Sequence, residues 1–254
     1  EVHVDENGQA SGVTFVNRLT NEDIRVDADR VILAASACET ARLMLNSKSA
    51  LHANGLANSS GQVGRNLMDS LGADIGGFIP ALKGRPKYNE DGYSSNHLYI
   101  PWWDNEGQKD GSLNFTRGYH FEIGGGFGSP GRGGAIFVYV YGKRAKDEVR
   151  DLYGTGIGLS LRGEMVQSDN CYCEIDEEVK DKWGIPVLKF HWQWSEQELN
   201  QVAHGLEWGK KIIEAMGGIV NNPDVTPQQA IKAGGQIIHE VGTTRMGDNP
   251  ATSV

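Results

Sequence analysis

Short β-rich segments separated by glycine and proline fill most of the chain between residues 70 and 190, and they constrain its fold more than any other feature. Such segments between turn residues are typical of strands. No helical pattern alternates with them, so they lack the crossover helices that a parallel sheet needs. The pattern therefore predicts an α+β fold in which residues 70–240 form one large antiparallel sheet of about six strands, backed by helices. The candidate strands are 72–80, 96–102, 112–122, 135–142, 156–163, 170–176 and 186–194.

One long helix is expected to cover this sheet. Ser195 and Glu198 have the spacing of a capping box, and Gly217 with Gly218 should end the helix near residue 216. The apolar residues of the segment fall near one helical face, which should pack inward. They are Leu199, Val202, Leu206, Ile213 and Met216.

The N-terminal part predicts a smaller β-meander followed by a helix. Strands are expected near 2–4 and 13–16, and a third from 24–26 that runs on to 31–35. The run 31–35 is apolar throughout, as a strand buried on both faces would be. Small residues then lead into a helix over 38–46, a geometry that lets a nucleotide approach the backbone closely.

Composition excludes some classes of function. The formal net charge of −9 argues against a nucleic-acid surface, which needs clustered Lys and Arg. No apolar run approaches the ~20 residues of a membrane-spanning helix. Cys38, Cys171 and Cys173 are too few and too irregularly spaced for a disulfide framework or a metal site, so we interpret them as ordinary core or surface residues.

Three segments, in this order along the chain, resemble motifs of the glucose–methanol–choline (GMC) oxidoreductases. Residues 31–47 resemble the strand-to-helix segment of the family's flavin domain, with Ser36 where members usually have Gly. Residues 63–70, Val-Gly-Arg-Asn-Leu-Met-Asp-Ser, resemble Val-Gly-x-Asn-Leu-x-Asp-His, with Ser70 in place of His. Residues 239–247, His-Glu-Val-Gly-Thr-Thr-Arg-Met-Gly, resemble His-x-x-Gly-Thr-x-x-Met-Gly. The likeness is closest to the bacterial sugar, gluconate and glycoside dehydrogenases.

The resemblance implies three parts. Residues 1–69 would be a remnant of the FAD-binding domain, with its β-meander, strand-helix and linker motif. Residues 70–238 would form the GMC substrate-binding domain, and residues 239–254 would begin the C-terminal active-site segment. FAD is the cofactor expected of the full-length protein, but the Gly-x-Gly-x-x-Gly fingerprint is absent here, so most of the FAD site is expected outside this chain. The glycine-rich run 124–134 is no substitute, since no helix is expected after it. We therefore expect the chain alone to bind FAD weakly or not at all, and to be inactive.

His239 is the candidate catalytic residue, because it matches the family's active-site histidine. Oxidation of an alcohol releases a hydroxyl proton, and an imidazole with an ordinary pKa of about 6.5 is suited to accept it. The competing interpretation is a buried structural histidine. The family's second active-site residue, a His or Asn, would lie beyond Val254. The expected cofactor contacts are Ala34, Ala35, Ser36, Gly242 and Thr243.

The expected substrate is a small sugar, polyol or sugar acid, oxidised at a CH–OH group by a dehydrogenase or an oxidase. His120 and Glu122 could border its pocket, and the indole of Trp102 could stack on a sugar ring, with structural roles as the alternative. Electrons would pass to an acceptor protein, a quinone or oxygen. Periplasmic and cytoplasmic locations in a bacterium both stay open. The alternative function is a non-catalytic sheet domain that binds carbohydrate or a partner protein, and the motif around His239 argues against it.

Overall fold

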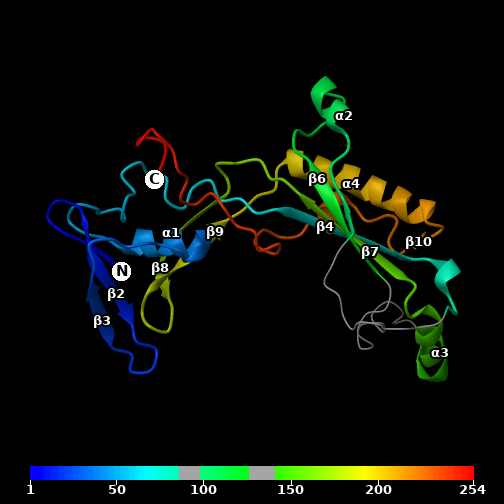
Figure 1. The fold of residues 1–254 in the computed structure, drawn as a ribbon, viewed down its shortest axis with the longest axis horizontal. Coiled ribbons are helices and arrows are strands. Elements are labelled where there is room, and N and C mark those ends of the chain that lie inside the picture. The colour runs from blue at the N-terminus through cyan, green and yellow to red at the C-terminus, as the bar shows by residue number, and fades with distance from the viewer. Residues whose placement is uncertain (86–97, 126–140) are drawn as a thin grey trace. The chain divides into compact units, whose positions relative to one another are not determined.

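The computed structural model describes three stretches of the chain, residues 1–85, 98–125 and 141–254 (Figure 1). Most of the glycine-rich run 124–134 and of the candidate strand 135–142 falls outside these described residues. Within the described stretches, every helix is too short or too polar to cross a membrane.

The chain divides into two compact units. The first comprises Glu1–Asp69, Val166–Gln193 and Ile238–Val254, and the second comprises Ser70–Met165 and Trp194–Ile237. Both units are therefore built from segments that lie far apart in the sequence. The functional domain boundaries expected from the resemblance stay a prediction.

The second unit is built on an antiparallel sheet. Its central strands are β4 (Leu71–Phe78), β7 (Gly156–Gly163) and β6 (Tyr119–Gly125), and the short strands β10 (Ile219–Val220) and β5 (Leu98–Ile100) lie at the edges. Every neighbouring pair in the order β10-β4-β7-β6-β5 is antiparallel, which confirms the predicted α+β fold. The candidate strands that correspond to these elements are 72–80, 96–102, 112–122 and 156–163.

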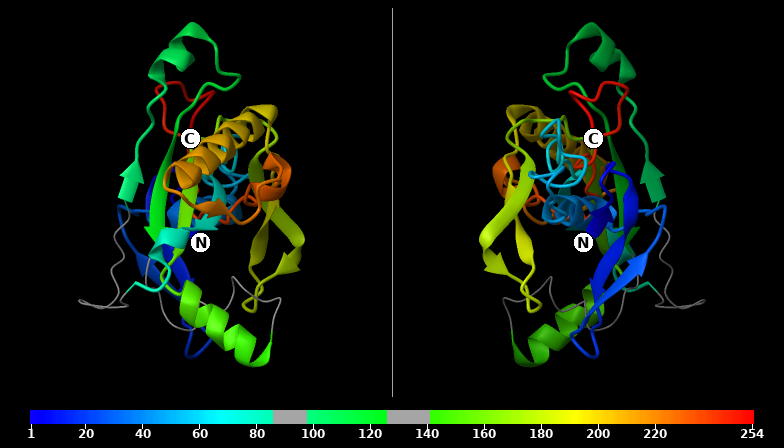
Figure 2. Two further views of the ribbon diagram at one scale, coloured as in Figure 1. Left: turned by 90° about the vertical axis from the view of Figure 1, so that its right-hand side faces the viewer. Right: turned by 90° about the vertical axis from the view of Figure 1, so that its left-hand side faces the viewer.

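Helix α4 (Glu196–Ala215) covers one face of this sheet and has 20 residues (Figure 2). The carboxylate of Glu198 accepts a hydrogen bond from the backbone N–H of Ser195 at 2.9 Å, as the capping-box spacing predicted. Met216, expected on the buried face, is 45% exposed because the helix ends one residue before it. Strands and helix together bury one apolar core. Its buried residues are Leu71, Ala73, Ile75, Phe115, Tyr119, Phe121, Ile157, Leu159, Leu161, Val202, Leu206 and Ile213.

The first unit begins with a three-stranded antiparallel meander, β1 (Val2–Val4), β2 (Ala10–Val16) and β3 (Asp23–Asp27). Helix α1 (Ser36–Asn46) follows, close to the predicted 38–46. The expected continuation of the third strand through 31–35 is wrong. No strand pairs with this run in the described part of the chain, so no hydrogen-bonded ladder defines it as a strand.

Strands β8 (Tyr172–Lys180) and β9 (Pro186–His191) form a separate hairpin in the first unit, so the prediction that they join the large sheet is wrong. The hairpin packs against α1, which gives its inward side chains an apolar partner of their own. Cys173 lies there in a small buried cluster, and burial raises the pKa of its thiol to about 12. All three cysteines are free, which fits core or surface thiols. The other buried members of the cluster are Ala41, Met44 and Val63.

Helix α3 (Gly142–Leu152) was not predicted, because its apolar stripe is only three residues long, Ala145, Val149 and Leu152, and none of its residues is buried. Ion pairs four residues apart support it instead: Lys143 with Asp147 at 2.6 Å and Arg144 with Glu148 at 3.1 Å. The remaining helical segments are short. They are the 3₁₀ turn η1 (Pro80–Leu82), α2 (Asn105–Asp110) and α5 (Pro227–Ala230).

Candidate active site

His239 lies in the first unit, in a loop whose backbone is fixed by Asp69. The side chain of His239 is exposed, so its imidazole is open to solutes. Its backbone N–H donates a hydrogen bond to Oδ1 of Asp69 at 2.9 Å. Asp69 is only 3% exposed, and a hydrogen bond to a buried carboxylate is stronger than one between neutral groups. The competing interpretation of His239, a buried structural histidine, does not fit this exposure.

The second and third motifs of the resemblance, residues 63–70 and 239–247, are hydrogen-bonded to each other. The N–H of Met68 donates to the carbonyl of Val241 at 3.0 Å, and the N–H of Val241 donates back at 2.9 Å. One step along, the N–H of Gly64 donates to the carbonyl of Thr243 at 2.8 Å. Residues 63–69 therefore act as a support on which residues 239–243 are held.

The close contact between residues 63–69 and 239–243 requires a glycine at position 242. Its φ is +95°, a conformation that costs other residues strain, and a Cβ there would overlap the carbonyl of Asn66. Asn66 itself is buried with φ of +58°, which asparagine tolerates better than most residues. The backbone conformations at positions 66 and 242 thus account for the asparagine and the glycine of the two motifs.

Ile238, next to His239, is a backbone outlier. It has φ of +60°, and its side chain is 75% exposed. The left-handed conformation costs an L-residue about 1–2 kcal/mol, and a β-branched side chain makes it rarer still. Such strain persists only where surrounding contacts impose it, and it clusters at functional sites.

The residues expected to contact FAD gather near the start of α1. Ala34, Ala35 and Ser36 are small and exposed, and they lead into the N-terminus of the helix. Ser36 has φ of +65°, which accounts for the glycine that family members usually carry there. Small exposed residues at a helix N-terminus leave room for the close approach of a nucleotide, so these three residues fit the group.

Thr243 joins this region to the His239 loop. It is fully buried, and its hydroxyl donates to the carbonyl of Ala37 in α1 at 2.7 Å. The hydroxyl is thereby bound within the protein, and the carbonyl of Thr243 accepts from Gly64, so the residue ties α1 to the support at residues 63–69. The structure brings Thr243 and Gly242 together with the start of α1, as the resemblance implied, but a cofactor role for them stays a prediction.

A polar surface covers the face of the second unit's sheet opposite α4. Strand register places Tyr99, Glu122, Ser160 and Asp74 in one row across β5, β6, β7 and β4. In the adjacent row His120 lies opposite Arg162. Side chains on a strand alternate between faces, so these residues share the side that the apolar core does not use.

The charged groups of this polar surface lie close together but are loosely paired. Nε2 of His120 is 3.6 Å from Oε1 of Glu122, and Nε of Arg162 is 3.9 Å from Oε2 of the same carboxylate. The hydroxyl of Tyr99 is 3.4 Å from Glu122. At these separations Arg162 and Glu122 keep capacity for further hydrogen bonds to a solute, whereas Nε2 of His120 is itself buried.

Asp74 ends the polar surface with tighter contacts. Burial alone would raise its pKa, but hydrogen bonds from Lys232 at 2.7 Å and Ser160 at 2.9 Å hold the pKa of this carboxyl below its ordinary value. Asp74 is therefore ionised near neutral pH. Ser160 and Arg162, which sequence analysis missed, alternate with Leu159 and Leu161, and that period-two pattern was the available signal.

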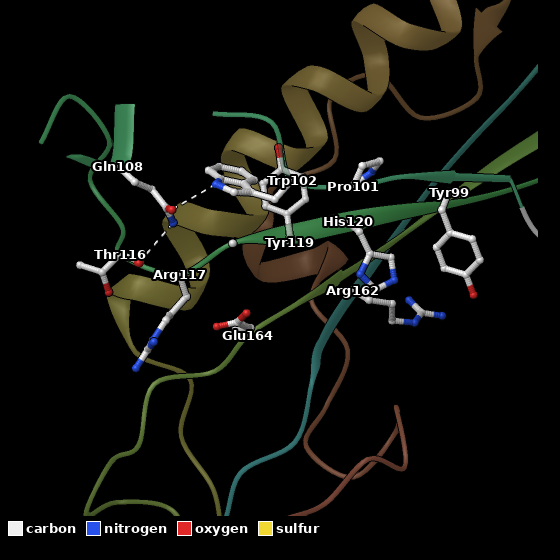
Figure 3. A pocket seen from close by; sticks show the side chains of 11 residues that line it. Tyr99, Pro101, Trp102, Gln108, Thr116, Arg117, Tyr119, His120, Arg162 and Glu164 are labelled. Atoms are coloured by element: carbon white, nitrogen blue, oxygen red, sulfur yellow. Dashed lines mark hydrogen bonds between the residues drawn. The ribbon is translucent and has the colours of Figure 1, made fainter. Parts of the chain in front are cut away.

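A cavity of about 510 Å³ opens beside this surface (Figure 3). Tyr99, His120 and Arg162 line it together with Arg117 and Glu164. His120 thus borders a cavity, as expected, whereas Glu122 lies on the adjoining polar surface. A substrate role for either residue stays a prediction.

Trp102 also lines the cavity, but much of it packs into the core. Its ring lies 5.1 Å from that of Tyr119 and 5.9 Å from that of Phe115, both edge to face. Its indole N–H donates to Oε1 of Gln108 at 3.1 Å (Figure 3). These contacts favour the structural alternative for most of the ring, while one part stays available to a solute.

His204 shows what a structural histidine looks like in this chain. The indole N–H of Trp208 donates to its Nε2 at 3.0 Å, so Nδ1 carries the proton that is shared with the hydroxyl of Tyr119 at 2.8 Å. Burial lowers the pKa of His204 below its ordinary value. In the described residues no group of three or more His, Cys, Asp and Glu is arranged to hold a metal ion.

Comparison with known proteins gives consistent results. Residues 167–254 match the family model described as GMC oxidoreductase. The chain is 25% identical over 267 residues to the 2-methyl-1,2-propanediol dehydrogenase of Mycolicibacterium austroafricanum, covering 100% of this chain and 44% of that protein. It is 25% identical over 242 residues to the fructose dehydrogenase large subunit of Gluconobacter japonicus, covering 91% and 40%. It is 24% identical over 251 residues to the paromamine 6'-oxidase of Streptomyces fradiae, covering 95% and 40%.

A solved structure is similar in fold. The crystal structure of formate oxidase aligns with a TM-score of 0.53 at 15% identity, over 85% of this chain and 42% of that one. At this identity the likeness concerns the fold alone. The chain spans less than half the length of the curated relatives it matches.

Proposed function

Starting from the confirmed likeness to the GMC oxidoreductases, whose family model residues 167–254 match, we propose that this chain is part of an FAD-dependent enzyme that oxidises a CH–OH group of a sugar, polyol or sugar acid. GMC oxidoreductases are FAD-dependent in general. The names of the relatives include two dehydrogenases and one oxidase, and a propanediol and fructose are among the compounds they name. The observation that carries the proposal is the exposed His239 on its hydrogen-bonded support.

The chemistry assigned to this chain is proton transfer. A bound flavin supplies the acceptor for the hydride that leaves carbon. An imidazole nitrogen of His239 takes the hydroxyl proton of the substrate, because the residue is exposed and imidazole is the side chain most often used as a general base. Ala34, Ala35 and Ser36 would hold part of the cofactor through their accessible backbone.

The polar surface of the second unit supports a hydroxylated substrate. Glu122 and Arg162 offer an acceptor and a donor at a spacing that leaves hydrogen-bonding capacity, as the ring hydroxyls of a sugar or the chain hydroxyls of a polyol require, and His120 borders the cavity beside them. The ionised carboxylate of Asp74 and the hydroxyl of Ser160 extend this array. A small apolar alcohol would leave most of these groups without partners.

The test is stopped-flow reduction of the flavin in the flavin-loaded full-length protein that carries His239→Ala. Removal of a general base typically lowers a rate by ~10²–10⁴-fold, and substrate affinity should change little. His191→Ala is the matched control: this histidine lies in the same unit but pairs with Glu174 and stacks on Tyr172. Reduction at a near-normal rate in a folded, flavin-loaded His239→Ala protein would remove His239 as the base. The alternative, a non-catalytic binding domain, predicts sugar binding with no flavin reduction in any variant.

A further inference from the structure

Three neighbouring features of the first unit belong to one arrangement. Asp69, at the end of the support formed by residues 63–69, has a buried carboxylate. Ile238 is a β-branched residue in a strained conformation, and the next residue, His239, is exposed. The hydrogen bond from the His239 N–H to Asp69 joins the first feature to the third. The peptide between Ile238 and His239 carries that N–H, so its orientation depends on the same bond.

The orientation of this peptide decides where the imidazole points. With the His239 N–H held on Asp69 and the backbone at Val241 held on Met68, φ of His239 has little freedom, and φ sets the direction of the Cα–Cβ bond relative to the held N–H. Two residues further on, the backbone is fixed by the paired bonds between Met68 and Val241. The segment 239–241 is therefore held at both ends: at His239 by Asp69 and at Val241 by Met68.

The strain at Ile238 indicates that the orientation is imposed. A β-branched residue adopts φ near +60° only when other contacts outweigh the steric cost. The Ile238 side chain is mostly exposed, so its own packing does not provide that compensation. A charge-assisted hydrogen bond to a buried carboxylate is of the strength required.

From this geometry we propose that Asp69 is a positioning residue for His239: it holds the Ile238–His239 peptide in a strained orientation that directs the imidazole. This inference rests on the proposed role of His239 as base. The contrasting possibility is that Asp69 only stabilises the fold of the first unit. The two ideas differ in what happens to His239 once the protein has folded.

The first experiment needs no cofactor and uses this chain alone. Amide hydrogen exchange is measured by NMR for the wild type, Asp69→Ala and Asp69→Asn. Loss of a hydrogen bond to a charged group should raise the exchange rate of the His239 amide by about 10- to 100-fold in Asp69→Ala. The amides of Met68 and Val241 should keep most of their protection. Asp69→Asn retains an oxygen at Oδ1, so its effect should be smaller. Equal loss of protection at all three amides would mean a general structural role and would overturn the inference.

The second experiment uses the flavin-loaded protein in a double-mutant cycle. Asp69→Ala alone should lower the rate of flavin reduction by about tenfold with little change in KM, since a displaced base transfers the proton less well. In the His239→Ala background the same change should have no further effect, because Asp69 acts only through the histidine. A full additional loss in that background would contradict the inference. If His239→Ala itself is harmless, the proposed function fails instead, so the two failures are distinguishable.

The third experiment tests the strain with a matched pair of glycine substitutions. Ile238→Gly and Ala57→Gly both replace a residue of positive φ, +60° and +52°, in the first unit. Glycine adopts this conformation freely, so neither variant should be less stable through its backbone conformation. Only Ile238→Gly should lower the flavin reduction rate, by about three- to tenfold, because the histidine loses its fixed direction. Identical rates in both variants and the wild type would show that the strained residue does not help to direct His239.

Discussion

The two units of this protein are held together by different means. The second unit has a core of twelve buried apolar residues between its sheet and α4, whereas the buried cluster of the first unit contains four. The first unit relies on backbone hydrogen bonds between distant segments and on residues of positive φ such as Gly242. Exposed large apolar side chains do not distinguish the units: Ile32 and Met246 in the first are 91% exposed, and Tyr141 in the second is 94% exposed. The comparison indicates that the sheet of the second unit is stabilised mainly by apolar burial, and the candidate active site mainly by backbone geometry.

The largest expected effect is the loss of a core aromatic residue from the second unit. Phe121 is fully buried, and Phe121→Ala should lower the free energy of unfolding of this unit by about 3–5 kcal/mol. Val63→Ala, in the smaller cluster, is the counterpart and should cost less because fewer apolar contacts are lost. Hydrogen exchange in β4, β6 and β7, compared with β8 and β9, reports the two units separately. A loss below about 1 kcal/mol for Phe121→Ala would break the comparison.

An intermediate effect is expected where the first unit depends on backbone shape. Gly242→Ala adds a Cβ that overlaps the carbonyl of Asn66 at a positive φ, and should cost about 1–3 kcal/mol in the first unit. Gly61→Ala is the control, because Gly61 has φ of +69° but open space where a Cβ would stand. Gly61→Ala should lower the free energy of unfolding by about 1 kcal/mol, the cost of a positive φ for a residue with a Cβ. The stability cost of each variant is measured by denaturation, with hydrogen exchange of the Met68 and Val241 amides as the local probe of the first unit. Equal losses would mean that the contact with Asn66 is unimportant.

The smallest expected effect is the loss of stability of the second unit when the pH is lowered and His204 becomes protonated. Burial lowers the pKa of His204 below its ordinary 6.5, so in the unfolded chain this histidine takes up a proton at a higher pH. Its contribution to stability is therefore present above pH 6.5 and is lost as the pH falls through the folded pKa. Protonation would also place a second donor opposite the indole N–H of Trp208. Unfolding curves between about pH 8 and pH 5 should show this slope in the wild type and a flatter one in His204→Gln. An unchanged slope would assign the acid sensitivity to other groups.

Sequence reasoning predicted the elements that have a periodic signal. The alternating strands β4, β6 and β7 and the capped helix α4 carry such patterns, and all four were expected. Helix α3 has no buried residue, and its one helical signal, the spacing of Ala145, Val149 and Leu152, was overlooked. Strand periodicity says which face is apolar but not which sheet a strand joins, so β8 and β9 were misplaced.

The candidate site was predictable only in part. His239 came from the resemblance, and Ser160 and Arg162 could have been found from strand alternation. The contact of Asp69 with His239 joins residues 170 positions apart, and no local pattern reports a bond of that range. The positive φ of Ile238 was equally hidden, because an isoleucine gives no sign of a left-handed conformation.

The discontinuity of the first unit has a consequence for biosynthesis. Its opening segment, Glu1–Asp69, cannot close onto residues 238–254 until the intervening chain has left the ribosome. At about 5–20 residues per second, that interval lasts on the order of ten to thirty seconds. The second unit also needs its last segment, Trp194–Ile237, but it is complete one step earlier. During synthesis the large sheet can therefore assemble first, and the segment Ile238–Val254, which includes His239, meets its partners in the first unit later.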